Sequence, residues 1–171
     1  MKVKFLITFL FLAFIIILFF LGLKNNNIYE TKNLIGKKIH NFEILNFDED
    51  TLIKNNSLKN NEYTLINFWS SWCTPCRNEH VYLSLLNKNN LKILGINFKD
   101  KKNNAKDFLS ELGNPYYEIL NDKNGKESVN FGVFGIPESI LVDKNLIIVK
   151  KYIGPLNKST YEEIIKIVKN K

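Results

Sequence analysis

A long apolar run near the N-terminus is the feature that most restricts how this chain can fold. From Phe5 to Leu23 nearly every residue is large and apolar, and only Thr8 and Gly22 interrupt the run. In a helix these 19 residues extend roughly 28 Å, because each residue adds about 1.5 Å, and this length is close to the hydrocarbon thickness of a bilayer. The run therefore predicts a membrane anchor over residues 1–24.

A cleaved secretory signal is the alternative interpretation of this run. Such signals have an apolar region of only about 7–15 residues, followed by a cleavage site of small residues. Here the run is longer, Leu21-Gly22-Leu23 is a poor cleavage site, and the cysteine that a lipoprotein signal needs is absent at this point. Both interpretations place the rest of the chain on the far side of a membrane. Lysines on both sides of the run leave its orientation undecided.

The remaining residues are enough for about one domain. Residues 25–33 predict a short polar linker, and residues 34–171 predict the domain. The net charge of +7 does not indicate nucleic-acid binding, because the lysines are scattered along the chain among many asparagines. This pattern predicts a solvated surface, and it leaves open a weak preference for anionic lipids or an acidic partner.

The order of the expected elements favours an α/β layer fold. Short apolar or alternating runs predict strands over 41–47, 63–69, 91–98, 117–120, 139–142 and 146–152. The first is expected at an edge of the sheet and the second at its centre. Helices are expected after Cys73, over 104–112 and 128–131, and from about Ser159, which can cap the last helix. Alternating strands and helices that end in a hairpin are typical of α/β folds.

The only two cysteines of the chain lie at the expected helix start after strand 63–69, in the run Trp72-Cys73-Thr74-Pro75-Cys76-Arg77. Unpaired N–H groups and the positive end of the helix dipole favour a thiolate at Cys73. Cys76 lies one turn further and is expected to be more buried. The spacing predicts an exposed nucleophile, which attacks a disulfide in a partner, and a resolving thiol, which then releases the reduced product. The same pair could donate its disulfide, so spacing alone leaves the direction open.

Three other uses of the cysteine pair have weaker support. A zinc site needs four ligands, and with only His40 and His80 available besides the cysteines, both histidines would have to converge on them. Covalent haem attachment requires Cys-x-x-Cys-His, and Arg77 occupies the fifth place. A purely structural bridge of this spacing closes too small a loop to stabilise much. We therefore expect no metal and no cofactor.

Together with Gly135-Ile136-Pro137 further along, the cysteine run resembles the thioredoxin fold, and more narrowly the thiol:disulfide interchange proteins of cytochrome c maturation (the DsbE/CcmG type). Cys-x-x-Cys-Arg-x-Glu-His combined with Gly-Val-x-Gly-x-Pro-Glu makes the resemblance specific, and it covers nearly the whole chain. The matching stretches are 34–37, 67–80, 94–100, 111–116 and 132–138.

The resemblance implies a thioredoxin-like fold, a central mixed sheet flanked by helices, preceded by one N-terminal transmembrane helix. It implies a reductase that keeps the haem-binding cysteines of apocytochrome c reduced, directly or through other maturation components. A membrane thiol transporter of the DsbD or CcdA kind would supply its electrons. The anchor would lie in the inner membrane and the domain in the periplasm.

The resemblance also suggests which residues tune the dithiol. Glu79 lies one turn beyond Cys76, and Glu138 directly follows Pro137, so both are expected close to the cysteines. Negative charge there opposes thiolate formation, which makes the couple more reducing. Spacing alone favours an ordinary first-turn glutamate at Glu79, and the resemblance favours the tuning role instead. Thioredoxins usually carry a buried aspartate at the place of Asn67, which cannot accept a proton, so Glu79 is the first candidate for a general base and Glu138 the second.

The substrate is expected to bind beside Pro137. In this fold the Ile136–Pro137 bond is cis and turns the Ile136 backbone outward, where an extended peptide can pair with it. A trans turn proline is the alternative. Trp72 either shields the dithiol or belongs to the core. Two other functions stay open: a general extracytoplasmic reductase with other clients, and a chaperone-like module that holds a cysteine-containing peptide.

Overall fold

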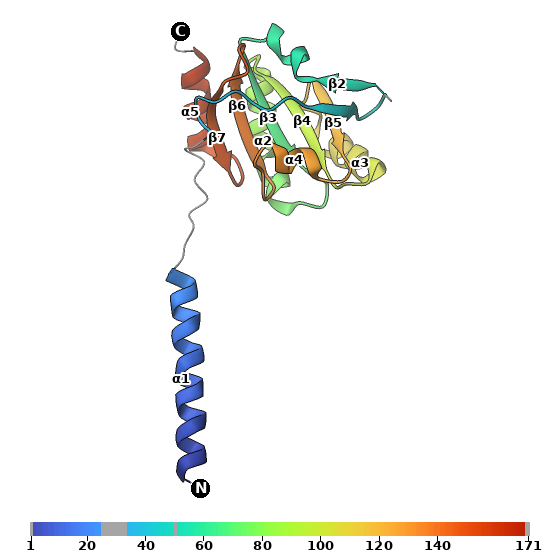
Figure 1. The fold of residues 1–171 in the computed structure, drawn as a ribbon. Helices are drawn as coiled ribbons and strands as arrows, with labels where there is room; N and C mark the ends of the chain where they lie inside the picture. Colours follow the sequence, from blue (N-terminus) through green and yellow to red (C-terminus); the bar gives the residue numbers. More distant parts are fainter. Residues whose placement is uncertain (1, 25–33, 50, 170–171) are drawn as a thin grey trace. The chain divides into compact units, whose positions relative to one another are not determined.

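The computed structural model describes residues 2–24, 34–49 and 51–169, and these form two separate units (Figure 1). The linker predicted over 25–33 lies outside the described residues. Helix α1 (Lys2–Lys24) is one unit, and its large apolar side chains between Val3 and Leu21 are exposed. The stretch Val3–Leu21 has a mean hydropathy of 2.9 and is, by length and composition, the one described helix that could cross a membrane. The exposed apolar surface of α1 fits the predicted membrane anchor, because an apolar helix surface is stable only in apolar surroundings such as a bilayer.

The second unit is built on a mixed seven-stranded sheet with the strand order β2-β1-β5-β4-β3-β6-β7. β3, β4 and β5 run parallel to one another, whereas β6, β7, β1 and β2 each pair antiparallel with their neighbours. The bounds are β1 Glu43–Asn46, β2 Leu52–Lys54, β3 Tyr63–Trp69, β4 Lys92–Phe98, β5 Glu118–Asp122, β6 Glu138–Asp143 and β7 Ile148–Ile153. Strand 63–69 lies inside the sheet, between β4 and β6, although the middle strand of the seven is β4. The predicted terminal hairpin, formed by β6 and β7, is confirmed.

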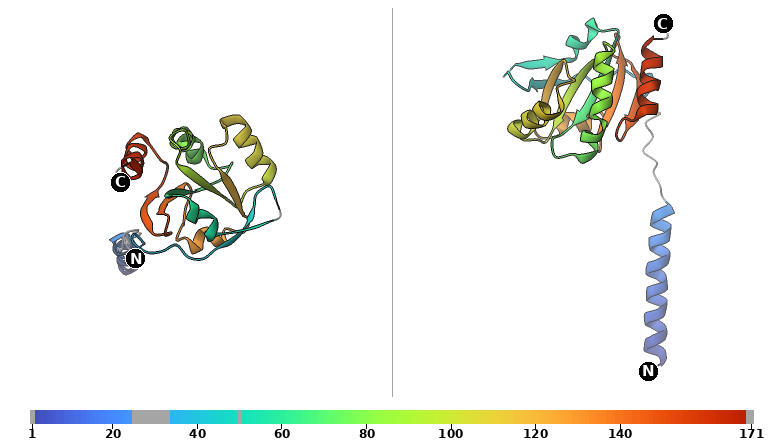
Figure 2. Two further views of the ribbon diagram at one scale, coloured as in Figure 1. Left: turned by 90° about the horizontal axis from the view of Figure 1, so that it is seen from above. Right: turned by 180° about the vertical axis from the view of Figure 1, so that it is seen from behind.

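Helices cover both faces of the sheet (Figure 2). β3 is buried on both sides, because its side chains alternate between two cores, with Leu65 and Trp69 in one and Ile66 and Phe68 in the other. The first core includes both cysteines and is covered by α2 (Thr74–Lys88), α3 (Lys102–Leu112) and α5 (Lys158–Lys169). The second is covered by α4 (Lys126–Asn130), the 3-10 helix Asn55–Asn60 and the segment before β1.

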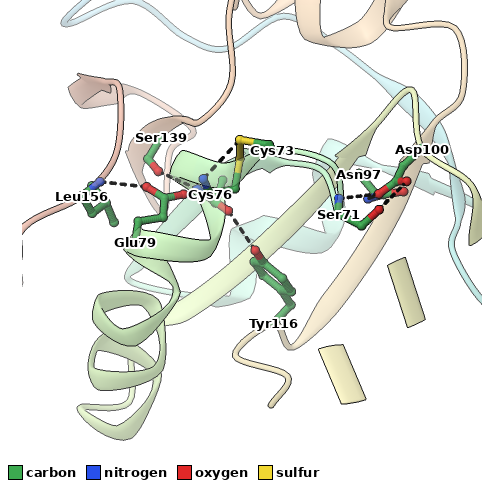
Figure 3. Close-up of a disulfide and its surroundings, with 10 residues drawn as sticks. Ser71, Cys73, Cys76, Glu79, Asn97, Asp100, Tyr116, Ser139 and Leu156 are labelled. Carbon is green, nitrogen blue, oxygen red and sulfur yellow. Dashed lines mark hydrogen bonds between the residues drawn. A yellow bond between two sulfur atoms is a disulfide. The ribbon is translucent and has the colours of Figure 1, made fainter. Parts of the chain in front are cut away.

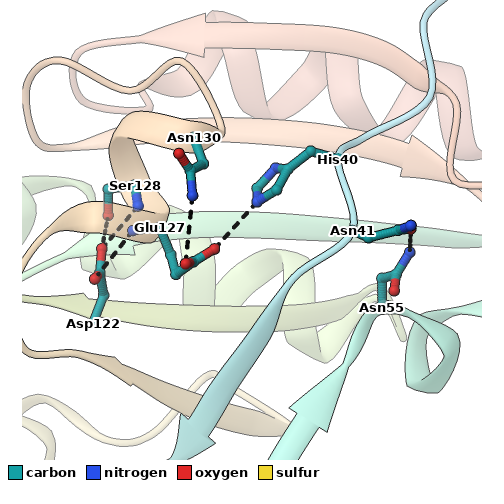
Figure 4. Close-up of polar contacts among 7 residues, drawn as sticks. All are labelled: His40, Asn41, Asn55, Asp122, Glu127, Ser128 and Asn130. Carbon is teal, nitrogen blue, oxygen red and sulfur yellow. Dashed lines mark hydrogen bonds and ion pairs between the residues drawn. The ribbon is translucent and has the colours of Figure 1, made fainter.

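Polar contacts fasten α4 to the second face (Figure 4). The Asp122 carboxylate accepts hydrogen bonds from the Ser128 N–H (2.8 Å) and hydroxyl (2.6 Å), which holds the start of α4 at the end of β5. His40 Nε2 lies 3.2 Å from Glu127 Oε2 and ties the segment before β1 to the same helix. Because α4 leads directly into residues 131–137, these contacts fix the approach of the chain to Pro137.

Two sequence-based expectations about element ends are wrong. The first predicted strand is not at an edge, because β2, whose short sequence gave no clear strand pattern, pairs outside β1. Ser159 does not cap the last helix. Instead the Asn157 side chain accepts from the Thr160 N–H at 3.1 Å, and the Thr160 hydroxyl accepts from the Asn157 N–H at 2.7 Å, so the reciprocal cap starts the helix at Lys158.

Candidate active site

The two cysteines form a disulfide at the start of α2 (Figure 3). β3 ends at Trp69, and after a short turn Cys73 becomes the N-cap of the helix, its sulfur accepting a hydrogen bond from the Cys76 N–H at 3.1 Å. Pro75 lies in the first turn, where its missing N–H is not needed. The sequence-based placement of Cys73 at a helix N-terminus is confirmed, so a Cys73 thiolate would face an N–H group and the positive end of the helix dipole.

The sequence predicts that Cys73 is more exposed than Cys76, but in this oxidised state the two cysteines differ little in exposure. Cys73 is 4% exposed and Cys76 2%. The prediction of an exposed Cys73 therefore does not hold here. Its sulfur is bonded to Cys76 and turned toward the backbone of its own helix, so the disulfide and the first turn together cover it.

Glu79 lies one turn after Cys76 on α2 and is completely buried. One carboxylate oxygen accepts from the Asn67 amide at 2.8 Å, and the other accepts from the Leu156 N–H at 2.8 Å. Burial raises the pKa of Glu79 to about 7, and the two hydrogen bonds counteract only part of this rise. Glu79 is thus not a solvated first-turn glutamate but a buried carboxyl that can take up and release a proton near neutral pH.

Asn67 stands at the centre of a buried polar network around Glu79. Its amide nitrogen donates to Glu79 and to the Ser139 hydroxyl (3.0 Å), and its oxygen accepts from the Tyr116 hydroxyl at 2.9 Å. Tyr116, Ser139 and Leu156 come from three other segments, and sequence reasoning did not identify them as site residues. Tyr116 and Ser139 belong to or adjoin stretches that carried the family resemblance, which was the only signal available.

Glu138 does not lie where the sequence reasoning placed it. It pairs across β3 with Phe68, on the face of the second core, whereas its neighbour Ser139 pairs with Asn67 on the cysteine face. The expectation that the Glu138 charge faces the dithiol is corrected, because adjacent residues of a strand point to opposite faces.

A buried lysine compensates the Glu138 charge. Glu138 Oε2 lies 2.8 Å from Lys151 Nζ, and the two side chains are 4% and 0% exposed. The other Glu138 oxygen accepts from the N–H groups of Phe134 and Gly135, both at 3.2 Å, and Lys151 donates to the Gly132 carbonyl at 2.6 Å. The pair thus holds the backbone of the loop that leads to Pro137.

The predicted substrate-binding residues are placed as follows. The Ile136–Pro137 peptide bond is cis, as the resemblance implied. Ile136 is partly buried and packs against both cores. Trp72 is 58% exposed, so it does not belong to the core, and its indole N–H donates to the Lys99 carbonyl at 3.2 Å. Phe134, which the sequence reasoning passed over, is 72% exposed in the loop before Pro137.

Asp100 braces the turn that precedes the cysteines (Figure 3). It accepts from the Ser71 N–H at 2.6 Å, from the Ser71 hydroxyl at 2.8 Å and from the Asn97 amide at 3.1 Å. Burial opposes its ionisation, but these hydrogen bonds outweigh burial and hold the pKa of Asp100 below its usual value. The carboxylate therefore stays charged and fixes the turn between β3 and α2.

The histidines lie apart from each other. His80 Nε2 is 2.9 Å from the Gly113 carbonyl, and His40 contacts Glu127 on the other face of the sheet. Since they do not converge on the cysteines, the zinc interpretation fails on geometry.

Comparison with known proteins shows the family to which the chain belongs. Residues 34–165 match the Redoxin family. The thiol:disulfide interchange protein DsbE of Haemophilus influenzae is 32% identical over 176 residues, which cover 100% of this chain and 97% of that protein. The thiol:disulfide interchange protein DsbE of Vibrio cholerae is 36% identical over 132 residues, 77% of this chain and 72% of that protein.

A solved structure, that of a thiol:disulfide interchange protein from Bacteroides sp., aligns with a TM-score of 0.67 at 22% identity, covering 78% of this chain and 90% of that one. At this identity the likeness shows the fold alone, and it confirms the predicted thioredoxin-like fold.

Proposed function

This chain belongs to the redoxin family, as a thiol–disulfide oxidoreductase similar to the interchange proteins, and from that premise we propose that it is a membrane-anchored periplasmic reductase in cytochrome c maturation. In this proposal residues 1–24 anchor the chain in the inner membrane, residues 25–33 form the linker and residues 34–171 form the reductase domain. Its client is apocytochrome c or another maturation component, and a membrane thiol transporter of the DsbD or CcdA kind reduces it. The length and apolar surface of α1 support the anchor, and the relatives, which are named thiol:disulfide interchange proteins, support the reaction.

The observation that carries the reaction is the disulfide at a helix N-terminus with a buried carboxyl one turn behind it. In the reduced protein the Cys73 thiolate attacks a client disulfide, so that a mixed disulfide forms and one client sulfur leaves and takes a proton from water. Glu79 then accepts the thiol proton of Cys76, and the Cys76 sulfur attacks Cys73. The bond between Cys73 and the client breaks, and the second client sulfur leaves as a thiolate that takes a proton from water. Two electrons pass from the dithiol to the client, and the enzyme is left with the disulfide seen in Figure 3.

The direction of electron flow is supported by Glu79 rather than by Glu138. An ionised, buried Glu79 beside the cysteines disfavours thiolates and thereby the reduced form, which makes the couple reducing. The charge of Glu138 is compensated by Lys151, so we assign Glu138 the task of holding the loop before Pro137. Client peptide would pair with the backbone at Ile136 beside the cis proline, with Trp72 and Phe134 offering exposed aromatic surface.

The client is tested by trapping the mixed disulfide. In Cys76→Ser the resolving thiol is absent, so the complex between Cys73 and its client should accumulate and be recovered under non-reducing conditions. We expect apocytochrome c or a maturation component in the trapped complex. The matched control is the double variant Cys73→Ser/Cys76→Ser, which should trap nothing.

Two outcomes would reject this function in different ways. Recovery of unrelated periplasmic proteins alone would favour a general reductase. Full function of Cys73→Ala in cells would favour a module that only holds peptides, since that variant cannot exchange disulfides.

The redox tuning by Glu79 gives a second prediction. At pH 8 the Glu79→Gln variant should have a higher reduction potential than the wild type, because the charge that opposes the thiolates is removed. A shift on the order of 10–30 mV is expected, since about 30 mV corresponds to 1.4 kcal/mol for a two-electron couple. Equilibration with glutathione at pH 8 measures it, and Glu111→Gln, at an exposed ion pair with Arg77, serves as the control. Equal potentials for wild type and Glu79→Gln would remove Glu79 from the tuning.

A further inference from the structure

Tyr116 reaches the active site from the segment before β5. It is 6% exposed, its ring stacks on Trp69 with a centroid distance of 5.3 Å and an interplanar angle of 18°, and its hydroxyl donates to Asn67 Oδ1 at 2.9 Å. Because the hydrogen-bond partner of the hydroxyl is Asn67, we expect its effect on the reaction to pass through the Asn67 amide. Figure 3 draws Tyr116 together with the disulfide and Glu79.

The hydroxyl stays a hydrogen-bond donor throughout the working pH range. Burial raises the pKa of Tyr116 well above its ordinary value, and the charge of Glu79 raises it further. A tyrosine hydroxyl that keeps its proton can fix the orientation of a side-chain amide. It donates to the amide oxygen, and the amide nitrogen, which is a donor, must then point the other way. With the oxygen of Asn67 held by Tyr116, the nitrogen must face Glu79 and Ser139.

We propose that Tyr116 is a positioning residue that holds the Asn67 amide in one orientation and thereby keeps Glu79 in the carboxylate form that can accept the Cys76 proton. This inference rests on the proposed role of Glu79 as proton acceptor. The reversed amide would present its oxygen to Glu79, and an acceptor there favours the protonated acid, which can donate to it. The Tyr116 hydroxyl opposes that reversal.

Few other ionisable groups meet Glu79 among the described residues. From β3 it accepts from the Asn67 amide, and from the segment after β7 it accepts from the Leu156 N–H. Neither group ionises in the working range. Cys76 lies one turn earlier on the same helix, and it does not titrate in the oxidised protein because it is held in the disulfide.

Tyr116 interacts electrostatically with Glu79 and keeps its proton, because burial raises its pKa. His80, the next residue of α2, lies against the Gly113 carbonyl, and burial lowers its pKa. The titration of Glu79 in the oxidised protein should therefore report on the amide orientation.

The experiment is a carbon-13 NMR titration of the Glu79 carboxyl in the oxidised full chain in detergent micelles, with the signal assigned from its loss in Glu79→Gln. In Tyr116→Phe, which retains the stacking ring, the midpoint should rise by about 0.5–1 pH unit, the size expected for one weakened hydrogen bond to the carboxylate. Tyr117→Phe, a change at the neighbouring, partly exposed tyrosine, should leave it in place. In an Asn67→Ala background, Tyr116→Phe should have no further effect.

An unchanged midpoint in Tyr116→Phe, or an equal shift in Tyr117→Phe, would overturn the inference. So would an equal shift in the presence and absence of the Asn67 side chain, because the effect would then not pass through the amide. None of these results depends on a client. A failed Cys76 trap with an intact Tyr116 effect would reject the proposed function alone.

Discussion

Lys151→Met should destabilise the domain by roughly 3–5 kcal/mol, the range found when one partner of a buried ion pair is removed. The lysine side chain is completely buried and lies 2.8 Å from Glu138, so its loss leaves a carboxylate in the protein interior without its counter-charge. The Gly132 carbonyl also loses its donor. Urea unfolding of wild type and variant at one pH measures the difference.

The adjacent residue supplies a matched control. Lys150 pairs with Glu163 at 2.7 Å, but both side chains are about two-fifths exposed (39% and 40%). Lys150→Met should therefore cost less than about 1 kcal/mol. The double variant Glu138→Gln/Lys151→Met should recover part of the stability, because no charge is left buried alone. A cost for Lys151→Met no larger than that for Lys150→Met would show that the pair does not fasten the loop before Pro137.

The sequence predicts those elements of the fold that depend on a few neighbouring residues. The run 63–69 is apolar and β-prone, and it forms β3, a buried interior strand of the sheet. Pro75 and the cysteine spacing marked a helix start, and Cys73 is its N-cap. Gly113 ends α3 as its position predicted. In each case the information lies within a few neighbouring residues, so it can be seen without knowledge of the tertiary structure.

The parts of the site that depend on long-range pairing were harder to predict. Glu138 follows Pro137 in the chain, but which face of β6 it occupies depends on register, and only the pairing with β3 places it opposite Phe68. In the sequence, nothing distinguishes Lys151 from the lysines expected at the surface. Its burial follows from its pairing with Ile140 on the face of the second core. The contact of Tyr116 with Asn67 joins residues 49 positions apart.

The buried state of Glu79 gives the second large effect, a dependence of stability on pH. An acid whose pKa is about 7 in the folded chain and 4.5 in the unfolded chain binds its proton more tightly when folded. Below pH 4.5 Glu79 is protonated in both the folded and the unfolded chain, so its titration does not change the free energy of unfolding. As the pH rises toward 7 the unfolded chain ionises first, so the folded state is progressively disfavoured, and the full penalty is reached above pH 7.

Glu79→Gln removes this titration. The difference in unfolding free energy between Glu79→Gln and wild type should therefore change in favour of the variant by roughly 2–3 kcal/mol between pH 5 and pH 8. The glutamine side chain can change the unfolding free energy by a constant amount, for example because it is a poorer hydrogen-bond partner for Asn67. A constant amount cancels when the two pH values are compared. Urea unfolding of the oxidised proteins keeps the thiols out of the measurement, and Glu111→Gln, at an exposed carboxylate 61% accessible, should run parallel to wild type. If Glu79→Gln also ran parallel, Glu79 would not titrate in this window, and it could not serve Cys76 as a proton acceptor near neutral pH.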